Sequence, residues 1–351
     1  MRPDSWDLKW PGKTQGRPAS GALNSLGFAA FPLEEEVVNR SDQRAMGKSM
    51  QAAVFAAGRA LGAAGLKGQA ELLADTQILT AGRCAERDDD LDDRLLASVP
   101  LPTASKATLA LRMGLRPSLF LAQLPNLISA NISIVHGVTG CSQTFLGEEG
   151  AGIEAIATAY ERIAHGMAER CLVGGVFSGA NGSITAAAAG ADLARRPERL
   201  TSLAAFLVLE SDASARRRDH RAGVSLDRHL RFSTENRVHN RNEVAFERVW
   251  EAIGGAAGAM VVTSSRGDAR SNQAEDAVLA ERSHNESRGE VRRLHAAFGT
   301  ALEAAAPSAL AFAVGALDDV QESSSEPPRA VVLNISSEGG GSIIVLEKLY
   351  G

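Results

Sequence analysis

The chain has 351 residues, of which 44% are hydrophobic, and its formal net charge at pH 7 is −5. This length can bury a sizeable core, either as one large α/β domain or as two smaller ones, and the composition is that of a soluble globular protein. The mildly acidic balance gives no indication of a nucleic-acid partner or a membrane surface, and no uncharged run is long enough to predict a membrane span.

Cysteine spacing and the N-terminal residues indicate the compartment. Cys84, Cys141 and Cys171 lie far apart, with neither CxxC nor histidine spacing, so the sequence predicts no disulfide framework and no metal site. We expect all three to be core thiols. Residues 1–20 form a polar extension without the apolar run of a signal peptide, which predicts a cytoplasmic protein, and no cofactor is expected.

The first part of the chain alternates strand-like and helical patterns. Residues 21–30 are strand-like, and Ser41 is the predicted N-cap of a helix that ends at Gly65. DTQILTAG, residues 75–82, predicts a strand. The acidic cluster at residues 86–93 has no spaced histidine, so we expect a solvated loop or helix start rather than a metal site.

The most informative stretch runs from residue 131 to residue 175. Residues 144–146 predict a short strand, after which the chain turns through GEEGAG, residues 147–152, into a helix with apolar residues at helical spacing. Residues 171–175 predict another buried strand, so the unit is βαβ-like with a parallel pair. Enzymes use such a turn to present a nucleophile at the positive end of a helix dipole. Glu149 occupies the apex, where the alternative role is that of a carboxylate capping the helix.

Later segments give a strand, a basic run and a second strand-to-helix unit. Residues 201–210 predict a buried strand. The basic residues between positions 211 and 222 predict a solvated loop, with docking of an acidic carrier protein as the functional alternative. Residues 259–263 read as a strand, and residues 264–275 open a helix.

The stretch around Glu149 resembles the active-site region of the β-ketoacyl-acyl-carrier-protein synthases, which belong to the thiolase-like superfamily. Their pattern is roughly G-P-N-x-T-x-x-T-A-C-A-S-G-x-x-A-I, then a helix ending in R-x-G and a strand ending in G-G. The acylated cysteine of the family falls on Glu149, and Cys141 stands where the family has proline. The matching positions are Gly140, Thr144, Gly152, Ala155, Ile156, Gly166, Gly174 and Gly175.

The resemblance covers residues 23–346 and implies an α/β, thiolase-like fold. In this fold two pseudo-repeated halves form a five-layered αβαβα arrangement. After the N-terminal extension, we expect a first half at residues 21–222 and a second half at residues 223–351.

The two catalytic histidines of the family are also replaced. SSRGDARSNQAE stands where the family has H-G-T-G-T-P-L-N-D-x-x-E, so one histidine falls on Ser264. HAAFGTALEAAA resembles K-x-x-x-G-H-x-x-G-A-A-G, which puts the other on Thr300. Condensation needs a thiolate and two imidazoles. The resemblance therefore implies a degenerate catalytic site with vestigial positions at Glu149, Ser264 and Thr300.

Four further positions are candidates for contact with an acyl substrate. Asn126 aligns with an asparagine near the dimer interface and substrate tunnel of the family, and Phe145 directly precedes the turn. His295 takes the place of the lysine, and Glu338 replaces a phenylalanine that gates the pocket.

The favoured hypothesis is a non-condensing partner of an active synthase, similar to a chain length factor. Its setting would be fatty acid elongation, including very-long-chain or lipid A pathways, or polyketide and aryl polyene synthesis. The implied partners are an active synthase subunit in a heterodimer, with a homodimer as the alternative, and acyl carrier protein. Two other hypotheses remain open: a malonyl-carrier-protein decarboxylase, and a binding protein for acyl carrier protein or lipid without a synthase partner.

Overall fold

A computed structural model of the protein describes residues 24–83, 124–182, 184–185, 197, 199–220, 222–233, 259–282, 290–320, 327–336 and 340–349. The predicted N-terminal extension, the acidic cluster at residues 86–93, Cys84 and residues 101–123 lie outside these ranges. Within the described part of the chain, no helix combines the length and the apolar character that a membrane span requires.

The first sheet has four strands and carries the turn identified in the sequence. Its order is β3 (Ser142–Phe145), β2 (Thr76–Gly82), β4 (Arg170–Phe177) and β6 (Leu203–Glu210). β2 is parallel to both β3 and β4, and β6 is antiparallel to β4. The predicted βαβ unit is therefore present, but β2 lies between its two strands, so these do not pair with each other.

The second sheet repeats this pattern. Its order is β7 (Val224–Ser233), β11 (Gly340–Lys348), β10 (Arg329–Ile335), β8 (Met260–Ser264) and β9 (Val291–Arg293). β8 is parallel to β9 and β10, and β11 is antiparallel to β10, as in the series β3-β2-β4-β6. The two sheets thus show the pseudo-repeat that the resemblance implies.

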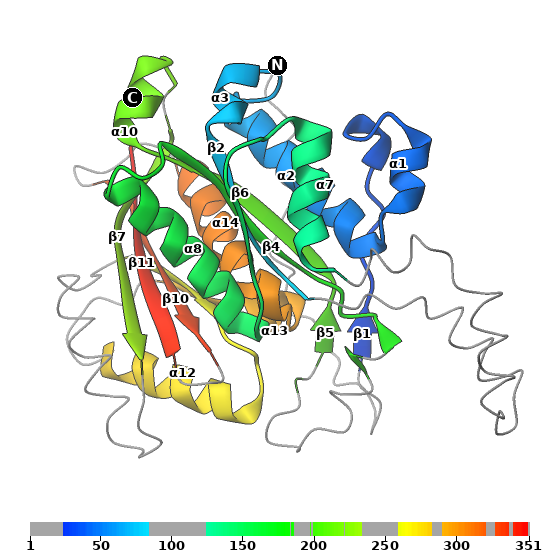
Figure 1. Ribbon diagram of the computed structural model, residues 1–351. Coiled ribbons are helices and arrows are strands. Elements are labelled where there is room, and N and C mark those ends of the chain that lie inside the picture. The colour runs from blue at the N-terminus through cyan, green and yellow to red at the C-terminus, as the bar shows by residue number, and fades with distance from the viewer. Residues whose placement is uncertain are drawn as a thin grey trace, which may run out of the picture.

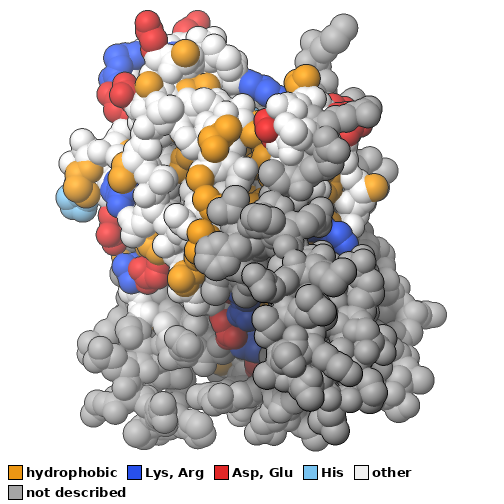
Figure 2. Space-filling model, turned by 45° about the vertical axis from the view of Figure 1, so that its right-hand side comes forward, with side chains coloured by type: hydrophobic (Ala, Val, Ile, Leu, Met, Phe, Trp, Pro, Cys, Tyr) orange, Lys and Arg blue, Asp and Glu red, His pale blue; other side chains and the backbone are white. Residues whose placement is uncertain are grey.

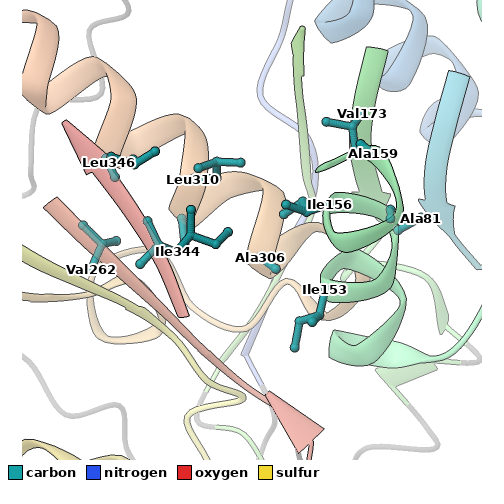
Figure 3. Close-up of a cluster of buried hydrophobic side chains, with 14 of the residues drawn as sticks. Ala81, Ile153, Ile156, Ala159, Val173, Val262, Ala306, Leu310, Ile344 and Leu346 are labelled. Atoms are coloured by element: carbon teal, nitrogen blue, oxygen red, sulfur yellow. The ribbon is translucent and has the colours of Figure 1, made fainter. Parts of the chain in front are cut away.

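Two helices form a central layer between the sheets, α8 (Glu148–Ala164) and α14 (Ala305–Asp318) (Figure 1). Figure 3 shows side chains of both helices and both sheets meeting in this layer, among them Ile156, Leu310 and Ile344. Each of these three is at most 1% exposed, and complete burial of such a side chain contributes about 1.5–3 kcal/mol.

The outer faces are covered by α2 (Lys48–Ala63) and α7 (Asn126–His136) on the first sheet and by α12 (Ala269–Arg282) on the second (Figure 1). The result is the expected α/β fold in five αβαβα layers. The remaining elements are β1 (Asn24–Leu26), η1 (Leu33–Glu35), α1 (Arg40–Ala45), α3 (Ala70–Ala74), β5 (Arg199–Thr201), α10 (Asp212–Arg217), α13 (Leu294–Phe298) and η3 (Leu302–Ala304).

The single helix expected from Ser41 to Gly65 is wrong, because α1 and α2 are separate. The N-cap is Asn39, whose Oδ1 accepts a 3.0 Å hydrogen bond from the Ser41 amide. Met46 is extended and buried between the helices, and the Gln51 amide donates to the Met46 carbonyl at 3.2 Å. A side-chain amide thus satisfies a carbonyl at the break.

The cysteine expectation holds for Cys171 and is wrong for Cys141. Cys171 is fully buried in β4, whereas Cys141 is exposed because it directly precedes β3, which lies at the edge of the first sheet. Burial raises the pKa of the Cys171 thiol to about 12.

The basic run after β6 forms the short helix α10 rather than a loop. Its arginines have carboxylate partners within the chain: Arg216 pairs with Asp212, Arg217 with Glu169 and Arg218 with Glu210. Arg221 of the same run lies outside the described residues, and docking of an acidic carrier protein here stays a prediction.

Candidate functional site

The turn between β3 and α8 is the centre of the candidate site. Gly147 has φ 120° and ψ 86°, and Glu148 has φ +31°, a left-handed conformation that residues other than glycine rarely adopt. The tight strand-to-helix turn predicted at residues 147–152 is thus present, with backbone strain at the residue before the predicted apex.

Glu149, which the resemblance assigns to the position of the acylated cysteine, is 1% exposed in the first turn of α8. Its carboxylate lies 4.0 Å from Nη1 of Arg266. A guanidinium and a helix N-terminus both favour the ionised form of a nearby carboxylate, whereas burial disfavours it. It is a poor carrier of an acyl group compared with a thiolate.

The start of α8 is in close contact with the backbone of the second half. A Cβ atom on Gly152 would lie 2.8 Å from the Glu303 carbonyl oxygen, and one on Gly175 would lie 2.3 Å from the same atom. Only glycine allows α8, β4 and η3 to approach this closely. This contact brings the nucleophile position and the residues around Thr300 into one place.

Ser264, the last residue of β8, stands at the first histidine position and is 2% exposed. Its hydroxyl donates a 2.6 Å hydrogen bond to Oδ1 of Asn334, whose amide donates to Oγ of Ser342 at 3.0 Å. The Ser264 side chain thus links β8, β10 and β11. A hydroxyl in this role cannot act as an imidazole does near neutral pH.

Thr300, at the second histidine position, is 3% exposed. Its hydroxyl donates to the backbone carbonyl of Arg266, its amide donates to the Arg199 carbonyl at 2.8 Å, and its own carbonyl accepts from the Thr201 amide at 2.9 Å. All three polar groups therefore have partners within the fold.

His295 is the one imidazole at a motif position, and its proton can be assigned. Ser265 donates a 2.5 Å hydrogen bond to Glu275, whose other oxygen accepts from Thr263 at 2.5 Å. Since the Ser265 hydroxyl has one proton and uses it on Glu275, Nδ1 of His295, 3.1 Å from Ser265 Oγ, is the donor in that contact. The serine lies between the imidazole and the carboxylate, so the order is not that of a nucleophilic triad.

A small cavity of about 10 Å³ adjoins this cluster, which is room for about one water molecule. Ser264, His295, Phe298 and Ser308 are among its lining residues. The described residues therefore enclose no space at this point that would fit an acyl chain. No group of His, Cys, Asp and Glu side chains within the described ranges is arranged to hold a metal ion.

The other predicted substrate contacts are dispersed. Asn126 is exposed at the start of α7, which covers the outer face of the first sheet. Phe145, at the end of β3, is half-buried against the central core. Glu338 lies outside the described residues.

Sequence reasoning missed a set of charged residues at the turn. Arg83, which follows β2, donates a 2.9 Å hydrogen bond to Glu303 of η3 and lies 3.4 Å from Glu148. Arg266 donates a 2.6 Å hydrogen bond to the other oxygen of Glu148. The sequence offered a signal, because charged residues stand at two motif positions where the family has small residues. Glu303 stands at the second glycine of the K-x-x-x-G-H-x-x-G-A-A-G pattern, and Arg266 stands at the first threonine of H-G-T-G-T.

Burial and the neighbouring charges shift the pKa values of Glu303 and Arg83 in opposite directions. Burial raises the pKa of Glu303, which is 1% exposed, and the neighbouring Arg83 only partly offsets the effect. Burial alone would lower the pKa of Arg83, but Glu303 and Glu148 outweigh it and raise that pKa.

Comparison with solved structures supports the same fold. The chain is similar to the ketosynthase in the AntDE:AntF complex, a type II PKS acyl-carrier protein with its ketosynthase (16% identity, TM-score 0.73, 93% of this chain and 90% of that chain covered). It is also similar to the ishigamide ketosynthase/chain length factor (17% identity, TM-score 0.70, 92% and 87% covered). A β-ketoacyl synthase from Burkholderia phymatum STM815 gives 18% identity, a TM-score of 0.68, and 89% and 85% coverage. At these identities the likeness establishes the fold.

No curated protein sequence matches the chain. The profile described as "Beta-ketoacyl synthase, N-terminal domain" matches residues 6–207, more than half of the chain. By this match and by its thiolase-like fold, the protein belongs to the β-ketoacyl synthase family.

Proposed function

We propose that this protein is a non-condensing partner of an active β-ketoacyl synthase, similar in role to a chain length factor. The observation that carries the proposal is the state of the three catalytic positions. Glu149 is buried beside Arg266, Ser264 is bonded to Asn334, and Thr300 holds the Arg266 backbone. None of these groups supplies a thiolate or an imidazole.

Two similar structures support the choice of partners. One is a ketosynthase/chain length factor, and another is a ketosynthase in complex with an acyl-carrier protein. By analogy, we propose an active synthase subunit as the heterodimer partner of this chain and acyl carrier protein as the carrier that the pair uses. Fatty acid or polyketide elongation is the proposed setting.

The edge of the first sheet offers a surface for such a partner. β3 pairs on one side only within the described sheet, and its Ser142 and Gln143 side chains are exposed. Ile134 on α7 is 75% exposed and Leu146, directly after β3, is 59% exposed. Figure 2 shows hydrophobic side chains gathered on the surface of the molecule. An open strand edge beside exposed apolar side chains favours strand pairing with another chain.

Co-expression with an active synthase of the same family tests the proposal. We expect a one-to-one complex by mass, and condensation of acyl groups only when both chains are present. The mass of the acyl product, read by mass spectrometry, would then give the chain length that the pair produces. Condensation by this chain alone, or carbon dioxide release from malonyl-carrier protein by the isolated chain, would overturn the proposal.

A matched pair of substitutions tests the surface. Leu146→Glu places a charge beside β3, and Val320→Glu places one on another exposed apolar residue, 39% exposed, after α14. We expect Leu146→Glu to weaken the heterodimer and Val320→Glu to leave it unchanged. Equal binding by both variants would exclude this edge as the interface.

A further inference from the structure

Glu148 has a role that its position in the sequence does not suggest. Its two carboxylate oxygens contact different arginines: Oε1 lies 3.4 Å from Nη2 of Arg83, and Oε2 accepts a 2.6 Å hydrogen bond from Arg266. Arg83 follows a strand of the first sheet and Arg266 follows a strand of the second. One carboxylate therefore connects the two sheets.

A second ion pair also joins the two halves, but here the arginine comes from the first half and the carboxylate from the second. Arg83, from the first half, donates a 2.9 Å hydrogen bond to Glu303 of the second half, whose side chain is 1% exposed. Arg266, from the second half, holds Glu148 of the first and is 16% exposed. Each arginine thus pairs with a carboxylate of the other half. Removing Arg83 would leave the buried carboxylate of Glu303 poorly solvated, whereas the side chains of Arg83 and Glu148 are 32% and 35% exposed.

Backbone strain coincides with these carboxylates. Glu148 has φ +31°, and Leu302, the neighbour of Glu303, has φ +25°. Residues other than glycine keep such conformations only where the surroundings hold them. An arginine contacts the side chain of Glu148 itself and that of Glu303, next to Leu302. A buried ion pair is weak evidence for added stability, so fixing one local geometry is the better account of this arrangement.

We propose that Arg83, Glu148, Arg266 and Glu303 form a charged brace that positions the end of strand β3. Leu146 and Gly147 are the only residues between β3 and Glu148, so the conformation of Glu148 determines how the edge strand enters the turn. This inference rests on the proposed function, because β3 is the edge that we assign to the synthase partner. The brace lies beside the altered catalytic positions, since Arg266 contacts both Glu149 and Thr300.

Hydrogen exchange of the full-length chain tests the brace without any partner. Glu148→Gln keeps the size of the side chain but removes its charge and replaces one acceptor oxygen with an NH2 donor, so the side chain can accept from only one of the two arginines. We expect amide exchange in residues 142–150 to become about tenfold faster, while β10 in the second sheet remains unchanged. Glu154→Gln is the matched control, since it breaks the exposed pair of α8 with Arg231 and should leave residues 142–150 unchanged.

A double-mutant cycle separates the brace from a general loss of stability. Arg266→Gln combined with Glu148→Gln should accelerate exchange by less than the product of the two single effects, because the two side chains act through one pair. Independent effects, or equal acceleration throughout the chain, would overturn the brace.

Heterodimer affinity then distinguishes the two proposals. If the wild-type chain binds no synthase while exchange responds as expected, the brace stands and the proposed function fails. If the wild-type chain binds and Glu148→Gln binds equally well, the brace does not position the partner surface.

Discussion

The Nη1 atom of Arg266 lies 4.0 Å from the carboxylate of Glu149, at the point where the family carries an acyl group on cysteine. The backbone carbonyl of the same arginine accepts a hydrogen bond from Thr300, at the position of a catalytic histidine. Arg266 thus joins two of the altered positions, one through its side chain and one through its backbone. Reversing one of the altered positions leaves the other two in place.

For this reason, Glu149→Cys alone should not restore condensation. The positive end of α8 would favour the thiolate form of a cysteine at the apex. Ser264 and Thr300 would still supply no imidazole to polarise the thioester carbonyl or to assist decarboxylation. The measurement is condensation of acyl groups by the purified variant, with an active synthase of the family as the positive control. Measurable product would show that other groups have taken over the role of the histidines.

Gly152→Ala should destabilise the protein. The added methyl group would lie 2.8 Å from the Glu303 carbonyl oxygen and 2.8 Å from Cδ of Pro307. Backbone cannot move aside easily, so we expect a loss of about 1–3 kcal/mol in the free energy of unfolding, measured with urea. Gly315→Ala is the control, because this helical glycine has no atom within 4 Å of the added Cβ and should gain about 0.5–1 kcal/mol. Similar shifts in both variants would contradict the close contact.

Local patterns sufficed to predict the elements around this contact. The strand-like residues 75–82 correspond to β2, in which six of the seven residues are buried, and the apolar residues at helical spacing after residue 152 correspond to α8. The break between α1 and α2 was not predictable in this way, since it depends on the side chain of Gln51 reaching back to Met46.

In the candidate site, too, some features were predictable from the sequence and others were not. The resemblance to the motifs of the family assigned the catalytic positions to Glu149, Ser264 and Thr300, and this assignment stays a prediction. The pairing of Arg83 with Glu303 joins residues 220 positions apart, and no periodic pattern reports a contact of that range. Charges at motif positions that normally hold small residues marked Arg266 and Glu303 as unusual, but their partners became evident only from the packing of the two halves.

The two described cysteines should differ in reactivity. Cys141 is exposed at the edge of the first sheet, whereas Cys171 is fully buried and burial raises the pKa of its thiol to about 12. The thiolate is the reactive form. With iodoacetamide at pH 8, peptide mass spectrometry should find Cys141 alkylated in the native protein and Cys171 alkylated only after unfolding in urea. Equal labelling of both in the native state would contradict the buried position of β4.

Glu303 should make stability fall as the pH rises. Burial raises its pKa above the ordinary value of 4.5, so between 4.5 and the raised value the folded state binds this proton more tightly than the unfolded state does. The contribution of Glu303 to the free energy of unfolding is therefore largest below its ordinary pKa, and it is lost as the pH rises through the pKa that Glu303 has in the folded state. Glu303→Gln keeps an acceptor for Arg83 but does not titrate.

The measurement is the free energy of unfolding in urea for wild type and Glu303→Gln at several pH values between 5 and 8. The wild type should lose stability relative to the variant as the pH rises, because other titrating groups are common to both chains and cancel in the difference. Glu154→Gln controls for the loss of an exposed carboxylate and should show no such trend. If the free energy of unfolding of the wild type instead increases relative to that of Glu303→Gln as the pH rises, then Arg83 outweighs burial and lowers the pKa of Glu303.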